Sequence, residues 1–265
     1  MFLVGIDSME NKKFVDLHSH TIYSDGTDTS ETLVRAAALK GTEVFALTDH
    51  DTMAGCEEAK KEADKWGVRL IPGVEISTSK YHILGLNVNP DYEEFQKFLL
   101  YSQEIQKDVC RKRIEKIAGS GMPITLDKLL NTFPKSRVGK YNILMTMLLD
   151  EECKKYIAEN FPGKTPDELF GYYLRTNGVA GKVKKDRVIH SAEAIEQIHG
   201  AGGIAIIAHP FKEVTNIEEE LGKLRLTGID GLEIQPNYED KNIPFRDYTI
   251  KNGMKITYGS DFHGP

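Results

Sequence analysis

The sequence predicts an α/β fold, a parallel barrel that is closed or nearly closed and that carries a helical insertion. Short apolar segments alternate with amphipathic segments in both terminal parts of the chain, which is typical of strands covered by helices. About seven segments are strand-like, and this number favours closure into a barrel. The middle of the chain breaks the alternation. We therefore expect a discontinuous barrel domain at residues 12–90 and 188–265, and a helical insertion domain at residues 91–187.

The first part of the chain supplies four strand-like and two helix-like segments. The strand-like segments are residues 14–18, 43–51, 68–77 and 81–88, and the helix-like segments are residues 27–41 and 54–67. Gly41 and Gly67 stand where the two helices should stop. The strands are short and almost continuously apolar, as strands covered on both faces should be.

The rest of the chain supplies the insertion and three more strands. The helix-like segments of the insertion are residues 93–119, 125–133, 141–160 and 166–176, and no strand-length alternating run interrupts them. After the insertion, residues 191–203 are helix-like, and residues 204–210, 229–235 and 254–263 are strand-like. The return of alternation indicates that the barrel resumes there.

The composition argues against several functional classes. A formal net charge of −6 provides no global basic field for duplex DNA. No apolar run approaches the roughly 18 residues that span a bilayer, and the N-terminal segment lacks the basic start of a signal peptide. Cys56, Cys110 and Cys153 are far apart and form no CxxC pair, which is typical of reduced thiols. We expect a cytoplasmic protein that binds neither duplex DNA nor membranes.

Polar residues gather where the predicted strands end. They are His18 and His20, then Asp49, His50 and Asp51, then Glu75, His82 and His209, and finally Asp261 and His263. The carboxyl ends of parallel strands meet at one face of an α/β fold, so these residues should converge. Imidazoles and carboxylates together suit Zn²⁺, Mn²⁺ or Fe²⁺, and there are more donors than one ion needs. We expect two or three divalent cations.

Each residue also has a structural explanation. A single histidine at a strand end is usually a hydrogen-bonded polar residue, but His18 and His20 share one strand face because side chains alternate. A carboxylate such as Glu75 in an apolar run is costly to bury without a partner or a metal. Asp51 is expected to cap a helix. His190 and His199 are expected to be structural.

Six motifs connect the sequence to a known family. They are "DLHSHTIYSDG", "ALTDHDT", "PGVEIS", "HILG", "AHP" and "GSDFHG". In order and spacing they resemble the PHP (polymerase and histidinol phosphatase) superfamily, from Phe14 to Gly264. The sequence is most similar to the branch of 3′,5′-nucleoside bisphosphate phosphatases and 5′-to-3′ exoribonucleases. The resemblance implies a distorted seven-stranded (β/α) barrel with a trinuclear metal centre.

The resemblance also implies which residues bind each metal. The first set is His18, His20, Glu75 and Asp261, the second is Asp25, His50 and His209, and the third is Glu75, His82 and His263. Aspartate at Asp25, where many histidinol-phosphatase-like members carry histidine, resembles the bisphosphate phosphatase branch. The sequence departs from the family at residues 139–142, "GKYN" in place of G-R-x-H. Lys140 keeps the charge there but lacks the planar fork of arginine.

The function implied is hydrolysis of phosphate monoesters by a hydroxide that bridges two metals. The expected substrates are 3′,5′-nucleoside bisphosphates or short oligonucleotides, and Asp25, His209 and His263 would act catalytically as metal-site residues. The candidates for holding a second phosphate are Arg111, Arg113, Arg137 and Lys140, although residues 111–113 fit a solvated helix face equally well. The alternatives are a histidinol-phosphate-type phosphatase of small molecules and a non-catalytic metal-binding module. A metal-dependent amidohydrolase is a more distant alternative.

Overall fold

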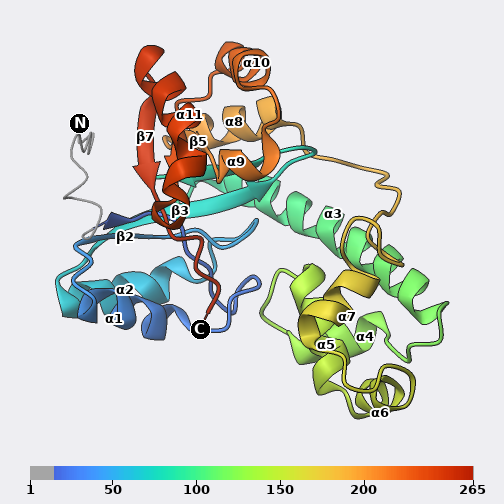
Figure 1. Ribbon diagram of the computed structural model, residues 1–265. Helices are drawn as coiled ribbons and strands as arrows, with labels where there is room; N and C mark the ends of the chain where they lie inside the picture. Colours follow the sequence, from blue (N-terminus) through green and yellow to red (C-terminus); the bar gives the residue numbers. More distant parts are fainter. Residues whose placement is uncertain (1–14, 265) are drawn as a thin grey trace. The chain divides into compact units, whose positions relative to one another are not determined.

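The computed structural model describes residues 15–264 (Figure 1). Contacts divide the chain into two compact units, Met1–Ser102 with Ile189–Pro265, and Gln103–Val188. The first is called the barrel unit below and the second the helical unit. The predicted domain boundaries at residues 90–91 and 187–188 stay a prediction, because compactness alone does not show which segments fold independently.

The barrel unit contains a seven-stranded sheet whose spatial order follows the sequence from β1 to β7. The strands are β1 (Val15–Asp16), β2 (Val44–Leu47), β3 (Arg69–Ser77), β4 (His82–Leu86), β5 (Ile204–Ile207), β6 (Gly231–Ile234) and β7 (Lys255–Tyr258). The two edges approach each other, since the Leu17 amide donates to the Tyr258 carbonyl oxygen at 2.8 Å and Asp261 N donates to His18 O at 2.9 Å. The predicted nearly closed barrel is therefore confirmed.

The expectation that all strands are parallel is wrong for β4. This strand is antiparallel to both β3 and β5, whereas the other neighbouring pairs are parallel. Only a tight turn separates it from β3, closed by a bond from Thr78 N to Tyr81 O at 3.1 Å, and a parallel crossover needs about a dozen residues or more. As a result Ser77, at the end of β3, pairs with His82, at the start of β4.

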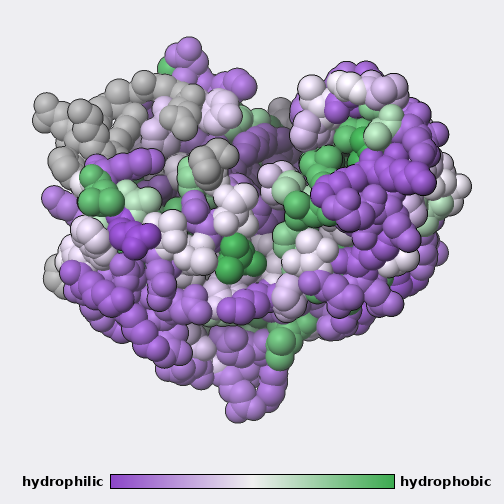
Figure 2. Space-filling model, turned by 90° about the horizontal axis from the view of Figure 1, so that it is seen from below, coloured by the Kyte–Doolittle hydropathy of each residue, from purple (hydrophilic) through white to green (hydrophobic). Residues whose placement is uncertain are grey.

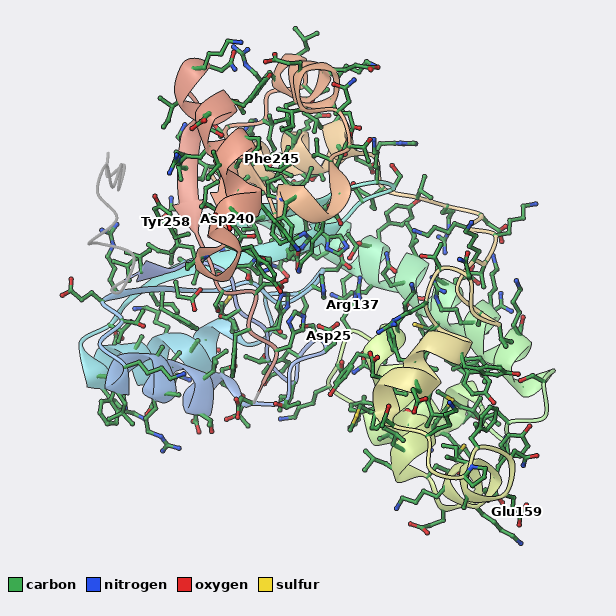
Figure 3. All side chains as sticks on the ribbon, in the orientation of Figure 1. Asp25, Arg137, Glu159, Asp240, Phe245 and Tyr258 are labelled. Carbon is green, nitrogen blue, oxygen red and sulfur yellow. The ribbon has the colours of Figure 1, made fainter. Side chains whose placement is uncertain are left out.

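Helices cover the sheet, as the alternation predicts. They are α1 (Ser30–Leu39), α2 (Cys56–Trp66), α8 (Ser191–Gly200), α9 (Pro210–Glu213), α10 (Gly222–Leu226) and α11 (Glu239–Lys251), with short turns η2 (Ile217–Leu221) and η3 (Pro236–Tyr238). Leu33 of α1 and Ala63 of α2 pack on Phe45 of β2 in one buried cluster. Phe245 of α11 and Tyr258 of β7 are also buried (Figure 3). Helix α2 ends at Gly67 in the left-handed region, as predicted.

The helical unit is built around its own core. Helix α3 (Glu93–Ala118) enters it, followed by α4 (Leu126–Thr132), α5 (Lys140–Leu149), α6 (Glu151–Asn160) and α7 (Pro166–Tyr173). Ile117, Leu129, Met147 and Tyr173 are buried together at its centre. Asn142 has a structural role, because its Oδ1 accepts the N–H of Gly139, the N-cap of α5, at 2.7 Å.

The surface and the thiols agree with the composition. Hydrophilic side chains predominate on the face shown in Figure 2. Among the described residues, no helix is long and apolar enough to cross a membrane. Cys56, Cys110 and Cys153 are all buried free thiols.

Candidate metal centre

All the predicted metal ligands lie at one edge of the barrel. His18 and His20 follow β1, His50 follows β2, and His209 follows β5. Asp261 and His263 follow β7, and Asp25 lies in the loop before α1. Because β4 is antiparallel, the start of β4 lies at the same edge as the carboxyl end of β3, so His82 and Glu75 reach the site from a single hairpin.

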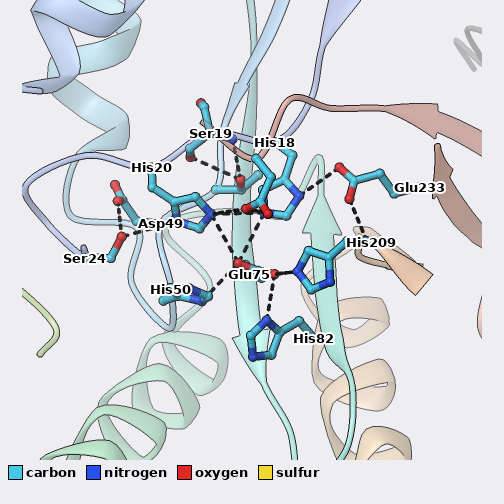
Figure 4. A network of polar contacts seen from close by, with 12 residues as sticks. His18, Ser19, His20, Ser24, Asp49, His50, Glu75, His82, His209 and Glu233 are labelled. Carbon is cyan, nitrogen blue, oxygen red and sulfur yellow. Dashed lines mark hydrogen bonds and ion pairs between the residues drawn. The ribbon is translucent and has the colours of Figure 1, made fainter. Parts of the chain in front are cut away.

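Glu75 is the centre of the cluster (Figure 4). Its side chain is fully buried and five imidazoles point at its two oxygens. Oε1 lies 3.0 Å from His209 Nε2 and 3.1 Å from His82 Nδ1. Oε2 lies 3.2 Å from His18 Nε2, 3.3 Å from His20 Nε2 and 3.0 Å from His50 Nδ1. One carboxylate in the middle of five imidazoles places acid and imidazole donors where divalent cations could be held.

The donor atoms fit cations better than they fit one another. His18 Nε2 and His20 Nε2 are 3.0 Å apart, and at most one of them can donate a proton to the other. Glu75 Oε2 and Asp25 Oδ1 are buried and make no hydrogen bond of acceptable geometry, although buried polar groups are almost always satisfied. Lone pairs that converge in this way are satisfied by divalent cations.

Four groups of atoms lie close enough to share an ion. They are His18, His20, Glu75 and Asp261; His20, Asp25, His50 and His263; His50, Glu75 and His82; and His82, His209 and Glu213. The first group equals the first set that the resemblance implies. In the other groups, His263 lies with Asp25 and His50, and His209 lies with His82. The resemblance implies the reverse, with His209 beside Asp25 and His263 beside His82.

This exchange follows from the strand pairing. His263 comes to Asp25, with Nε2 3.3 Å from Oδ1, because the segment after β7 runs beside the segment after β1. His209 comes to His82, because β5 pairs with β4 and Ala208 N donates to His82 O at 3.0 Å. The sets that joined His209 to Asp25 and His263 to His82 therefore do not match the geometry. Which ion each residue binds stays a prediction.

Electrostatics at this edge favour positive charge. Burial alone would raise the pKa of Glu75, but His50, His18 and His82 hold it well below its usual value. Burial likewise opposes the charged form of Asp261, yet His18 and His20 keep its pKa low. For His20, burial lowers the pKa while Asp261 and Glu75 raise it to about 9. Carboxylates that stay ionised so deep in the protein require cationic partners.

Glu233 contacts the cluster and was not selected by the sequence analysis. Its Oε1 lies 2.8 Å from His18 Nδ1, and its Oε2 accepts the His209 N–H at 2.7 Å. This pairing turns His18 Nε2 toward Glu75 and fixes the backbone at His209, as outer carboxylates do around metal sites. The signal was present, because Glu233 is an acid within a short apolar strand, just like Glu75.

Two other acids position the site. Asp49 accepts bonds from Thr21 N at 2.7 Å and Ser24 Oγ at 2.6 Å, and so holds the loop that carries Asp25. Glu213 accepts the His82 N–H at 2.8 Å. Its place in a short helix after β5 gave no recognisable signal in the sequence.

The prediction that Asp51 caps a helix is wrong. Helix α2 begins at Cys56, and Gly55 stands at its N-cap without a side-chain bond. Asp51 belongs to the turn after β2, where its Oδ1 accepts Ser77 N–H at 2.9 Å and Ser102 Oγ–H at 2.8 Å. The turn between β2 and α2 places Asp51 too far from the helix start to cap it.

Backbone strain also concentrates at this edge. His209 has a φ of 29° and Asp261 a φ of 56°. Residues with side chains rarely adopt positive φ, and such strain clusters at functional sites.

His199 lies elsewhere, with Nε2 2.8 Å from Asp230 Oδ2, and His190 is exposed before α8, so neither belongs to the cluster.

The predicted phosphate-binding residues lie in the helical unit. Arg111 is committed to Asp108, at 2.7 Å, and to Glu115 along α3, which fits the solvated helix face. Arg113 is buried and donates to the carbonyl oxygens of Ala180 and, at 2.9 Å, Gly181. Arg111 is therefore paired with acids on an exposed helix face, whereas Arg113 is buried against backbone carbonyl oxygens, although only one residue separates them.

Lys140 belongs to a cluster of positive charge. It lines a cavity of about 600 Å³ with Arg175 and other residues of α7 and the turn that follows. Burial and the charges of Arg113 and Lys185 lower the pKa of Lys140. Desolvation and the charges of Arg113 and Arg137 likewise lower the pKa of Lys185, a residue that the sequence analysis did not select. Cations that repel one another in this way are suited to bind an anion.

Comparison with known proteins decides the family. The PHP domain matches residues 16–132. Over 263 residues the chain is 30% identical to a 5′-3′ exoribonuclease of Haemophilus influenzae, covering 96% of this chain and 91% of that protein. The chain belongs to the PHP family. This PHP protein is also 27% identical to a 3′,5′-nucleoside bisphosphate phosphatase of Chromobacterium violaceum, over 95% of this chain and 87% of that protein.

Solved structures have the same fold. A protein of Chromobacterium violaceum described as an amidohydrolase, with bound sulfate, superposes with a TM-score of 0.80 at 26% identity, over 94% of this PHP protein and 87% of that chain. A Bifidobacterium adolescentis protein assigned as a metal-dependent phosphoesterase superposes with a TM-score of 0.80 at 24% identity, with the same coverage. The predicted PHP fold is confirmed.

Proposed function

We propose that this PHP protein is a metal-dependent hydrolase of phosphate monoesters, and that its substrates are nucleotides. The observation that carries the proposal is the convergence of five imidazoles on the buried Glu75 carboxylate, at 3.0 to 3.3 Å. The names of its relatives, an exoribonuclease and a nucleoside bisphosphate phosphatase, support the same reaction class.

The donor groups have room for two or three divalent cations, of manganese, iron or zinc. The predicted holders are His18, His20, Asp25, His50, Glu75, His82, His209, Asp261 and His263, with Glu213 as an added candidate. Cations bound there would offset charge on the phosphoryl oxygens and lower the pKa of a bound water.

The chain's own hydroxyls at this edge are held by hydrogen bonds, which supports water as the nucleophile. Ser19 Oγ donates to Ala46 O at 2.9 Å. Thr21 Oγ1 and Ser24 Oγ each donate to Asp49 at 2.6 Å. An activated hydroxyl nucleophile needs a free line of attack. Ser19, Thr21 and Ser24 are buried, and their hydrogen bonds fix the loop before Asp25.

Two features support nucleotides as the substrate class. Asp25 occupies the position at which the sequence resembles the bisphosphate phosphatase branch. In the helical unit, burial and the charges of Arg113 and Lys185 lower the pKa of Lys140, and burial and the charges of Arg113 and Arg137 lower the pKa of Lys185. Positive charge gathered in this way suits an anion such as a phosphate. Arg111 is a weaker candidate because the carboxylates of Asp108 and Glu115 already neutralise its charge, whereas Arg113 donates to neutral backbone carbonyl oxygens.

The test is hydrolysis of adenosine 3′,5′-bisphosphate by protein that has been stripped with a chelator and then reloaded with Mn²⁺, Fe²⁺ or Zn²⁺. We expect phosphate release that is lost on stripping and restored by at least one metal. Full activity in the metal-free protein would refute the proposal.

The same preparation separates the alternatives. A histidinol-phosphate-type phosphatase would release phosphate faster from histidinol phosphate than from the bisphosphate. Release of mononucleotides from a 5′-phosphorylated oligoribonucleotide would extend the proposal to an exoribonuclease. A non-catalytic module would bind the metal and hydrolyse none of these substrates.

A further inference from the structure

Two aromatic side chains stand beside the candidate metal centre and are not part of it. Phe211 lies in α9, two residues after His209 at the end of β5, and Tyr238 closes η3 after β6. Strands β5 and β6 are parallel neighbours, so both segments start at the edge where the metal ligands gather. The two rings contact each other with centroids 4.8 Å apart and planes at 38°.

Two lysines flank this pair. Lys212 Nζ lies 2.6 Å from Asp261 Oδ2 and 6.0 Å from the centroid of the Phe211 ring. Lys241 Nζ lies 5.7 Å from the Phe211 centroid and 5.2 Å from the Tyr238 centroid. The Lys212 ammonium group therefore lies between the Phe211 ring and Asp261, a predicted metal ligand.

The pair is incompletely covered by the protein. The side chain of Tyr238 is 42% exposed, and Phe211 is only partly buried. Within the described part of the chain, Lys241 is exposed and pairs with no carboxylate. An exposed aromatic pair with adjacent positive charge has the composition of a surface on which nucleic-acid bases stack while phosphates are neutralised.

We propose that Phe211 and Tyr238 form a stacking surface for the base of a nucleotide, with Lys241 and Lys212 neutralising its phosphate charge. The inference rests on the proposed phosphoesterase function and assigns the surface that would recognise the base of its nucleotide substrates. A base-free sugar phosphate would use the metal centre alone. Stacking is sequence-tolerant because every base has a π face, so adenine and uracil nucleotides would both bind here.

The experiment compares Tyr238→Ala with the matched control Tyr238→Phe, which keeps the ring. Stacking contributes about 1–3 kcal/mol per base, so Tyr238→Ala should raise KM for adenosine 3′,5′-bisphosphate roughly 5- to 150-fold. We expect kcat, and hydrolysis of ribose 5-phosphate, to stay at the wild-type value. Tyr238→Phe should behave as wild type.

A second readout does not depend on activity. Stacking quenches 2-aminopurine fluorescence, so the metal-loaded wild type and Tyr238→Phe should quench 2-aminopurine riboside 5′-phosphate, and Tyr238→Ala and Phe211→Ala should quench it much less. Equal quenching by all four proteins, or equal loss of activity on both substrates in Tyr238→Ala, would overturn the inference. Failure of the phosphoesterase proposal would look different, because the wild type would hydrolyse neither substrate while quenching could still be measured.

Discussion

Replacement of Glu233 by glutamine is expected to weaken metal binding without removing any metal ligand. In the wild type both carboxylate oxygens face nitrogen donors, His18 Nδ1 at 2.8 Å and His209 N at 2.7 Å. Glutamine supplies one acceptor oxygen and one NH₂ group, so one donor would face another donor. Glu233 is fully buried, and water cannot relieve the mismatch.

The size of the effect follows from this geometry. Loss of an outer-shell partner typically lowers metal affinity about 10- to 100-fold, which is about 1.4 to 2.8 kcal/mol. An unsatisfied buried donor also costs about 1–3 kcal/mol of stability. We therefore expect Glu233→Gln to fold, to melt earlier, and to bind Mn²⁺ or Zn²⁺ at least tenfold more weakly by calorimetric titration.

Asp230→Asn is the matched control at the opposite end of β6. Asp230 Oδ2 pairs with His199 Nε2 at 2.8 Å and with Ala205 N at 2.9 Å, so the two acids pair with the same kinds of group. The control should lose stability and keep its metal affinity. Unchanged metal affinity in Glu233→Gln, or an equal loss in both variants, would refute the role given to Glu233.

The remaining predictions concern other parts of the protein. Asp25→Asn should lower kcat for the bisphosphate at least 100-fold, since a neutral amide replaces a carboxylate among three imidazoles; wild-type turnover would contradict this. Lys140→Arg should lower KM for substrates with two phosphates by providing a planar fork, whereas Arg111→Ala should leave KM within about twofold. Tyr23 Oη donates to Glu58 Oε1 at 2.7 Å, and this bond, with burial, raises the pKa of Tyr23 to about 12. Tyr23→Phe should therefore lower the free energy of unfolding, measured in urea, by about 0.5–1.5 kcal/mol below pH 10, the usual pKa of a phenol. The difference from wild type should vanish as the pH rises through 12. A difference that stays constant at all pH values would contradict the prediction.

The sequence predicted the residues of the candidate site better than their grouping. Glu75 was recognisable because an acid in an apolar strand needs a partner, and the histidines because they stood where strands end. The partners of His209 and His263 depend on which strands are neighbours, and on the direction of β4. The short turn after Ser77 indicates an antiparallel β4, but the alternation of strands and helices along the rest of the barrel favours parallel strands.

The helical unit was the harder part. Asn142 looked like a lost substrate contact, and it caps α5 instead. The sequence could not distinguish Arg111 from Arg113. Arg111 pairs with acids of its own helix, whereas Arg113 donates to backbone carbonyl oxygens of residues 180–181, which are distant in the sequence. Lys185 emerged only when folding brought it near Arg113 and Arg137.

Glycine explains why the ligand segments can approach so closely. A Cβ on Gly259 would lie 2.3 Å from Glu233 Oε1 and 2.3 Å from the His18 Cβ, so alanine there would push apart the very pair that orients His18. A Cβ on Gly26 would lie 2.4 Å from the carbonyl oxygen of His20 and would displace the loop that carries Asp25. Contacts of this kind between backbone and ligand segments are open only to glycine. The two glycines therefore belong to the site as much as its ligands do, because they let the segments after β1 and β7 bring their histidines and carboxylates within reach of common ions.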